Sequence, residues 1–104
     1  MRTVAETPIF MRYASEIWSE VERQEFITFI AANPEAGAVI RGSGGCRKVR
    51  WSRSGIGKRG GARVVYFVAR DEVVWLLIVY TKAKFDTLPT SFLAQLRQGV
   101  EDAV

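Results

Sequence analysis

The segment Arg63–Tyr80, RVVYFVARDEVVWLLIVY, contains the two most strand-like runs of this 104-residue chain. Residues 63–68 are mainly β-branched and aromatic, and residues 73–80 are apolar throughout, as expected of a central strand. Arg70, Asp71 and Glu72 separate the two runs and have the polar character of a turn. The segment therefore predicts a β-hairpin at the centre of a sheet.

A further strand is predicted immediately before this hairpin. From position 46 onward the side chains alternate with a period of two, which places Lys48 and Arg50 on one face of a strand. Arg47, Val49 and Trp51 fall on the other face. Two cations therefore point in the same direction.

Two helices are predicted at the N-terminal side of the sheet. Thr7 followed by Pro8 is typical of a helix start, and the residues at positions 9, 13 and 17 continue one apolar face. Ser19 and Glu22 form a capping box that begins the second helix, which ends before Pro34. Its expected apolar stripe consists of Val21, Phe26, Ile27 and Ile30.

A C-terminal helix is predicted after Pro89, because apolar residues then recur at helical spacing. The predicted fold is α+β: an antiparallel sheet with two N-terminal helices and a C-terminal helix packed on it, in one domain over residues 1–104. The predicted core includes Phe26, Phe29, Phe67 and Trp75. Trp51 and Tyr80 are left open between packing in the core and stacking on a base.

Several protein classes are excluded by composition. The longest apolar run ends before Lys82 and is too short to span a membrane. Glu6 and Pro8 interrupt the N-terminus before a secretory signal could form, so we expect a cytoplasmic protein. With Cys46 as the one cysteine and no histidine, the chain has no internal disulfide, histidine triad or histidine-ligated metal centre. We expect neither a metal nor a cofactor.

The positive charge is concentrated in the middle of the chain. The net charge is +4, and no acidic residue occurs between Glu35 and Asp71. This arrangement favours a nucleic-acid partner over the alternative, a solvated basic surface. The cations in this window are Arg41, Arg47, Lys48, Arg50, Arg53, Lys58, Arg59, Arg63 and Arg70.

Residues 55–60 spell G-x-G-x-x-G, but a predicted strand follows, whereas a dinucleotide site requires a helix there. We interpret the segment as a hairpin loop whose glycines let Lys58 and Arg59 reach a phosphate backbone. A disordered loop is the alternative interpretation.

The side chains available for catalysis are mainly lysine, arginine and tyrosine, since Glu20, Glu22 and Glu25 are better explained as a solvated helix face. These types suit RNA cleavage, because RNA supplies its own nucleophile, the 2′-OH. Arginine can clamp the phosphate through two hydrogen bonds, and a lysine near other cations can transfer protons.

Two strings of the sequence resemble the RelE/HigB family of type II toxin–antitoxin toxins, in particular its HigB-like branch. They are residues 42–50, GSGGCRKVR, and residues 57–66, GKRGGARVVY. Two predicted helices precede them, and residues 79–82 and a terminal helix follow, so the resemblance covers nearly the whole chain. It implies a RelE-like, microbial-RNase-like fold and a ribosome-dependent mRNA endonuclease, or mRNA interferase, that inhibits translation and arrests growth.

The resemblance also implies partners. A cognate antitoxin, of the helix-turn-helix DNA-binding kind, would neutralise the toxin, and operator DNA would be reached only through that complex. The ribosome and mRNA are the other expected partners, with no membrane involved.

The family pattern implies roles for individual residues. Lys48 and Arg50 match two cations that contact RNA and assist proton transfer, Arg63 matches a transition-state arginine, and Lys82 matches a lysine after the last strand. The chain departs from the RelE branch at Ala83, where that branch has arginine. The expected RNA-binding residues are Arg47, Arg53, Lys58, Arg59, Tyr80 and Lys84.

No tyrosine follows Tyr80 to act as general base, so the base is unassigned and Lys48 is the first choice. Lys84 is a candidate for the missing cation. Two alternatives remain: a ParE-like toxin that inhibits DNA gyrase without cutting nucleic acid, and a non-catalytic partner of an antitoxin.

Overall fold

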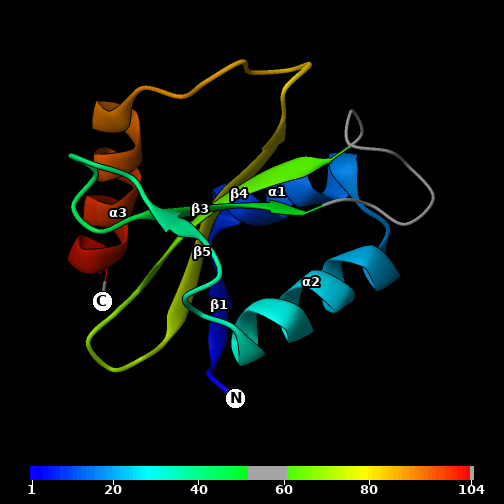
Figure 1. Cartoon of the computed structure of the whole chain (residues 1–104), viewed down its shortest axis with the longest axis horizontal. Coiled ribbons are helices and arrows are strands. Elements are labelled where there is room, and N and C mark those ends of the chain that lie inside the picture. The colour runs from blue at the N-terminus through cyan, green and yellow to red at the C-terminus, as the bar shows by residue number, and fades with distance from the viewer. Residues whose placement is uncertain (52–60, 104) are drawn as a thin grey trace.

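The predicted hairpin forms the centre of the sheet in the computed structural model, which describes residues 1–51 and 61–103 (Figure 1). Strands β4 (Ala62–Val68) and β5 (Val74–Thr81) pair antiparallel. In the turn between them, the Asp71 carboxylate accepts a hydrogen bond from the Val73 amide at 3.2 Å, and Glu72 has a φ of 68°. The predicted turn is therefore confirmed.

The sheet has five strands in the order β1-β5-β4-β3-β2. The other three are β1 (Val4–Glu6), β2 (Ala38–Val39) and β3 (Arg47–Trp51). The pairs from β2 to β5 are antiparallel, but β1 runs parallel to β5. The α+β prediction is confirmed, with the correction that the sheet is mixed. Two helices separate β1 from the rest of the sheet, and so long a connection allows a parallel pairing.

Both N-terminal helices begin at the predicted caps. In front of α1 (Pro8–Ile17), the Thr7 hydroxyl accepts a hydrogen bond from the Phe10 amide at 3.1 Å. In front of α2 (Glu20–Ala32), Ser19 and Glu22 form the reciprocal capping box, with bonds of 3.2 and 2.9 Å. The C-terminal helix α3 spans Thr90–Ala103. Side-chain acceptors thus satisfy amides that the first turns of α1 and α2 leave unpaired.

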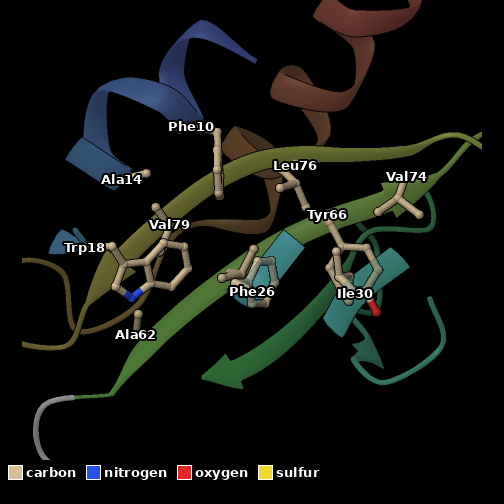
Figure 2. Packing of buried hydrophobic residues seen from close by; sticks show 11 residues of the cluster. Phe10, Ala14, Trp18, Phe26, Ile30, Ala62, Tyr66, Val74, Leu76 and Val79 are labelled. Atoms are coloured by element: carbon tan, nitrogen blue, oxygen red, sulfur yellow. The ribbon is translucent and has the colours of Figure 1, made fainter. Parts of the chain in front are cut away.

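The helices supply two apolar clusters to the core. Phe10 of α1 and Phe26 of α2 belong to the first cluster, together with Tyr66 of β4 (Figure 2). Leu93 of α3 belongs to the second, with Val65 of β4. In Figure 1, α3 and α2 lie on opposite sides of the strands. The alternation along β4 therefore fills two separate apolar layers.

Strand β5 has a bulge at Leu77. Val65 pairs with Ile78 while Tyr66 pairs with Leu76, so Leu77 has no partner of its own in the ladder. Leu77 and Ile78 consequently both join the cluster that contains Leu93.

The aromatic residues predicted to be core are buried to different degrees. Phe26 and Phe67 are fully buried, whereas Phe29 and Trp75 are partly buried and pack against the two clusters. Trp51, whose role was left open, packs on Phe26 and Phe29 with ring centroids 5.5 and 4.7 Å apart. Trp51 is therefore partly buried and packs against the core.

Val21 was wrongly placed in the apolar stripe of α2, since it is 66% exposed. It precedes Phe26 by five residues, which is about 140° around an α-helix at 3.6 residues per turn. Its side chain therefore faces away from the side that packs on the sheet.

The Tyr66 hydroxyl holds the segment that follows α2 against the sheet. It accepts a hydrogen bond from the Gly37 amide at 2.9 Å and donates one to the Pro34 carbonyl at 2.8 Å. A Cβ at Gly37 would lie 2.9 Å from the Tyr66 ring and from the Lys48 carbonyl oxygen. Only glycine leaves room for this approach.

Replacing Tyr66 with Phe should lower the unfolding free energy by about 1–3 kcal/mol at neutral pH, because the Gly37 amide loses its partner. Burial raises the pKa of Tyr66 above its usual 10.0. As pH rises, the Tyr66 phenol therefore loses its proton in the unfolded chain before it does so in the folded one. The unfolding free energy of the wild type should fall as pH rises through 10, and that of Tyr66→Phe should fall less steeply. Urea unfolding between pH 7 and pH 11, roughly the range around this pKa, measures both effects.

Tyr80→Phe is the matched control at neutral pH, since its hydroxyl makes no hydrogen bond among the residues described here. Equal losses in the two variants would contradict the role given to the Tyr66 hydroxyl.

Candidate nucleic-acid interface

Three of the predicted site residues lie together on one face of the sheet. Lys48 and Arg50 are both exposed on β3, and Arg50 pairs in register with Arg63 on β4. Lys48 pairs with Val65, which belongs to the apolar cluster on the α3 side of the sheet. We call Lys48, Arg50 and Arg63 the cationic patch.

The pairing of Arg50 with Arg63 places two positive side chains directly opposite each other. Cβ atoms of directly opposite residues on antiparallel strands are separated by roughly 5 Å, and like charges at that position are destabilising. A bound anion would convert this repulsion into attraction for both guanidinium groups. The arrangement is suited to a phosphate.

The patch has no acidic partner within the described part of the chain. Ion pairs there join Arg2 to Glu72, Lys84 to Glu16, and Arg23 to Glu6 and Glu20, but none includes a patch residue. Glu6, Glu16, Glu20 and Glu72 thus pair with cations elsewhere. Within the patch, Lys48 and Arg50 are exposed and Arg63 is partly buried.

Lys82 lies at the same end of the sheet as the patch. It directly follows β5, whose last pairs with β4 are Thr81 with Ala62 and Tyr80 with Arg63. Its side chain is exposed and forms no ion pair within the ranges that the structure describes. The four residues predicted to be catalytic therefore lie on β3, on β4 and directly after β5, with Arg50, Arg63 and Lys82 towards one end of the sheet.

Other predicted RNA-binding residues lie in different surroundings. Arg47 faces the opposite side of β3, where its guanidinium donates a hydrogen bond to the Gly37 carbonyl at 2.8 Å. The ammonium group of Lys84 lies 3.3 Å from the Glu16 carboxylate and 4.8 Å from the centroid of the Tyr13 ring. Their interactions in this structure are within the protein.

Tyr80 is almost fully buried, with 2% of its surface exposed, so its ring has no free face for a base in this conformation. Burial raises the pKa of its hydroxyl, an effect that the charge of Arg63 partly opposes. The predicted RNA contacts of Arg53, Lys58 and Arg59 fall outside the described residues.

An apolar cavity of about 440 Å³ lies away from the patch. It is formed by the start of α1, β5 and α3, and its lining includes Pro8, Trp75, Leu96 and Val100. None of the predicted catalytic residues lines it. The candidate site is thus an exposed surface, as expected for a partner as large as RNA.

Sequence reasoning missed two aromatic residues next to this end of the sheet. The Phe85 ring makes edge-to-face contacts with Tyr13 and Tyr80, with centroids 6.1 and 6.2 Å apart. Tyr13 falls in the apolar periodicity of α1, so its spacing indicates only packing. For Phe85, the available signal was its position in the sequence close to Tyr80, Lys82 and Lys84, which were already predicted site residues.

The chain matches no model of a known protein family. Among the described helices, none combines the length and apolar character needed to cross a membrane. Within residues 1–51 and 61–103, no group of three or more cysteine or acidic side chains is arranged to hold a metal ion.

Proposed function

We propose that this chain is the toxin of a type II toxin–antitoxin system, a RelE/HigB-like endonuclease that cleaves mRNA on the ribosome in the cytoplasm. The observation that supports the proposal most strongly is the side-by-side placement of Arg50 and Arg63, with Lys48 on the same face and no acidic partner within the described chain. Such a surface is poised for a phosphate backbone.

The proposed reaction uses the nucleophile of the RNA itself. The 2′-oxygen attacks the adjacent phosphorus, the bond to the 5′-oxygen breaks, and the products carry a 2′,3′-cyclic phosphate and a 5′-hydroxyl. Lys48 is our candidate to accept the 2′-OH proton, a step that requires its side chain to be in the uncharged amine form. A proton must also reach the departing 5′-oxygen, and Lys82 is our candidate donor.

Arg50 and Arg63 would stabilise the charge that develops on the phosphate oxygens. Their guanidinium groups are permanently charged and present several N–H donors in a fixed plane. Donors already directed at developing charge contribute more in the transition state than in the ground state, which raises the rate.

The proposed antitoxin would inhibit by covering the cationic patch. An acidic segment would replace the phosphate as counter-ion for Arg50 and Arg63, so antitoxin and RNA would compete for one surface. Operator DNA would be bound by the antitoxin component of the complex.

Replacing Arg50 with Ala should weaken binding of a short single-stranded RNA about tenfold, the loss expected for one charge-assisted hydrogen bond. It should also make the plot of log affinity against log salt concentration shallower by about 0.7, because one phosphate contact is removed. Fluorescence anisotropy across a salt series measures both quantities.

Arg70→Ala is the matched control. Arg70 is exposed, forms no ion pair among the described residues, and lies beyond the far end of β4. The end of β4 at Val68 is itself about 16 Å from Arg63 at 3.3 Å per residue, and Arg70 follows in the turn. If both variants changed the slope equally, RNA binding would not be localised at the patch.

A further inference from the structure

The residues that follow β5 form a tight turn that carries Lys82. The amides of Lys84 and Phe85 both donate hydrogen bonds to the Thr81 carbonyl at 3.1 Å. We call residues 82–85 the lysine turn. Lys82 and Lys84 are exposed, whereas Phe85 is partly buried.

Helix α1 holds the lysine turn from one side. The Phe85 ring meets the Tyr13 ring edge-to-face, with an interplanar angle of 77°. The Lys84 ammonium lies over the Tyr13 ring and pairs with Glu16, one turn farther along α1. Tyr13 therefore contacts both residues that close the turn, and Glu16 contacts Lys84.

Strand β5 holds the turn from the other side. Phe85 also packs edge-to-face on Tyr80, with an interplanar angle of 70°. Tyr80 is almost fully buried and pairs in register with Arg63. Lys82 lies in the sequence between Tyr80 and Phe85, so both sides of its backbone are attached to packed aromatic rings.

These contacts connect Lys82 to Arg63 through packed groups. Arg63 pairs with Tyr80 on the neighbouring strand, and the Tyr80 ring packs on Phe85, which belongs to the same turn as Lys82. The Phe85 ring is held in turn by Tyr13 on α1. A flexible Lys82 would occupy many positions relative to a phosphate held by Arg63. Reaction rates depend steeply on such positions, since a misplacement of 1 Å can lower a rate about 100-fold.

We infer that Tyr13 and Phe85 are positioning residues, which fix Lys82 relative to Arg63 and thereby set the cleavage rate without contacting the RNA. The inference rests on the proposed function and adds α1 and the lysine turn to its site.

The first test uses cleavage of ribosome-bound mRNA. Tyr13→Leu and Phe85→Leu should each lower kcat by about 10- to 100-fold, with KM changed by less than about twofold because the patch that binds RNA is intact. Tyr13→Phe retains the ring, so its kcat should stay within about threefold of wild type.

A double-mutant cycle identifies the group through which these residues act. If Phe85 acts by placing Lys82, then Phe85→Leu should cause no further loss of kcat in a Lys82→Ala background. If the factors by which Phe85→Leu and Lys82→Ala lower kcat multiply in the double variant, the inference is overturned. A change in KM alone would also overturn it.

A second measurement does not depend on activity. The NMR order parameter of the Lys82 backbone amide should be about 0.85 in wild type and below about 0.6 in Phe85→Leu, as for rigid and flexible backbone. A Lys82 amide that stays rigid in Phe85→Leu overturns the positioning role, whether or not the chain cleaves RNA. If the wild-type protein does not cleave mRNA, but Phe85→Leu shows the expected loss of order at Lys82, the proposed function is overturned instead.

Discussion

Replacing Arg63 and Lys82 together with Ala is expected to lower the rate of mRNA cleavage by at least about 10³-fold, because removal of a single preorganised transition-state donor already costs about 10²- to 10³-fold. Arg63 provides a guanidinium beside Arg50, and Lys82 provides an ammonium at the same end of the sheet. Single-turnover cleavage of ribosome-bound mRNA measures the loss.

The fold of the double variant should remain intact. Neither side chain forms an ion pair within the described part of the chain, and removal of Arg63 relieves its repulsion with Arg50. The unfolding free energy should therefore stay within about 0.5 kcal/mol of wild type for the exposed Lys82, and within about 1 kcal/mol for the partly buried Arg63. The control Arg12→Ala with Arg70→Ala removes two exposed cations elsewhere and should cleave normally.

Undiminished cleavage by the Arg63→Ala, Lys82→Ala variant would remove these residues from the site. Equal losses in the control variant would show that overall charge, and not the position of these two groups, determines the rate.

Phe26→Ala is expected to lower the unfolding free energy by about 3–5 kcal/mol, the usual cost of truncating a fully buried phenylalanine. Phe26 is 0% exposed, and its ring packs against those of Trp18 and Trp51, with centroids 5.4 and 5.5 Å away (Figure 2 shows Phe26 and Trp18). A loss of this size is a large part of the 5–15 kcal/mol typical of a folded domain. Urea denaturation monitored by tryptophan fluorescence measures it.

Val21→Ala is the matched control on the same helix. Val21 is 66% exposed, so its truncation should change stability by no more than about 0.5 kcal/mol. Comparable losses in the two variants would contradict the assignment of Phe26, and not Val21, to the packed face of α2.

Local features of the fold were predictable from the sequence because their causes are local. The Thr7 cap, the Ser19–Glu22 capping box and the turn at Asp71 each depend on side chains within a few residues of the backbone groups they satisfy. The same applies to the exposed face of β3, since alternation along an extended strand places Lys48 and Arg50 together.

Features that depend on distant segments were not predictable. The parallel pairing of β1 with β5 is determined by where the chain returns after α1 and α2, and no local pattern records that. The bulge at Leu77 lies in a run that is apolar throughout, so no alternation of polarity reveals it. The burial of Tyr80 likewise depends on Phe85, which the sequence places after a turn.

The candidate site was predictable from the sequence only in part. Lys48 and Arg50 followed from strand alternation, whereas Arg63 and Lys82 were placed by resemblance to a family, and the structure adds that Arg63 is the register partner of Arg50. The contacts of Tyr13 and Glu16 with the lysine turn join residues about 70 positions apart and have no sequence signature.

The most direct test of the central proposal is to express the chain in bacteria without an antitoxin and to map new 5′ ends on abundant transcripts by primer extension. The proposal predicts growth arrest with cuts confined to translated regions, and none with the Arg63→Ala, Lys82→Ala variant. Growth arrest with intact mRNA would contradict it and favour a ParE-like inhibitor of gyrase, and normal growth would favour a non-catalytic partner of an antitoxin.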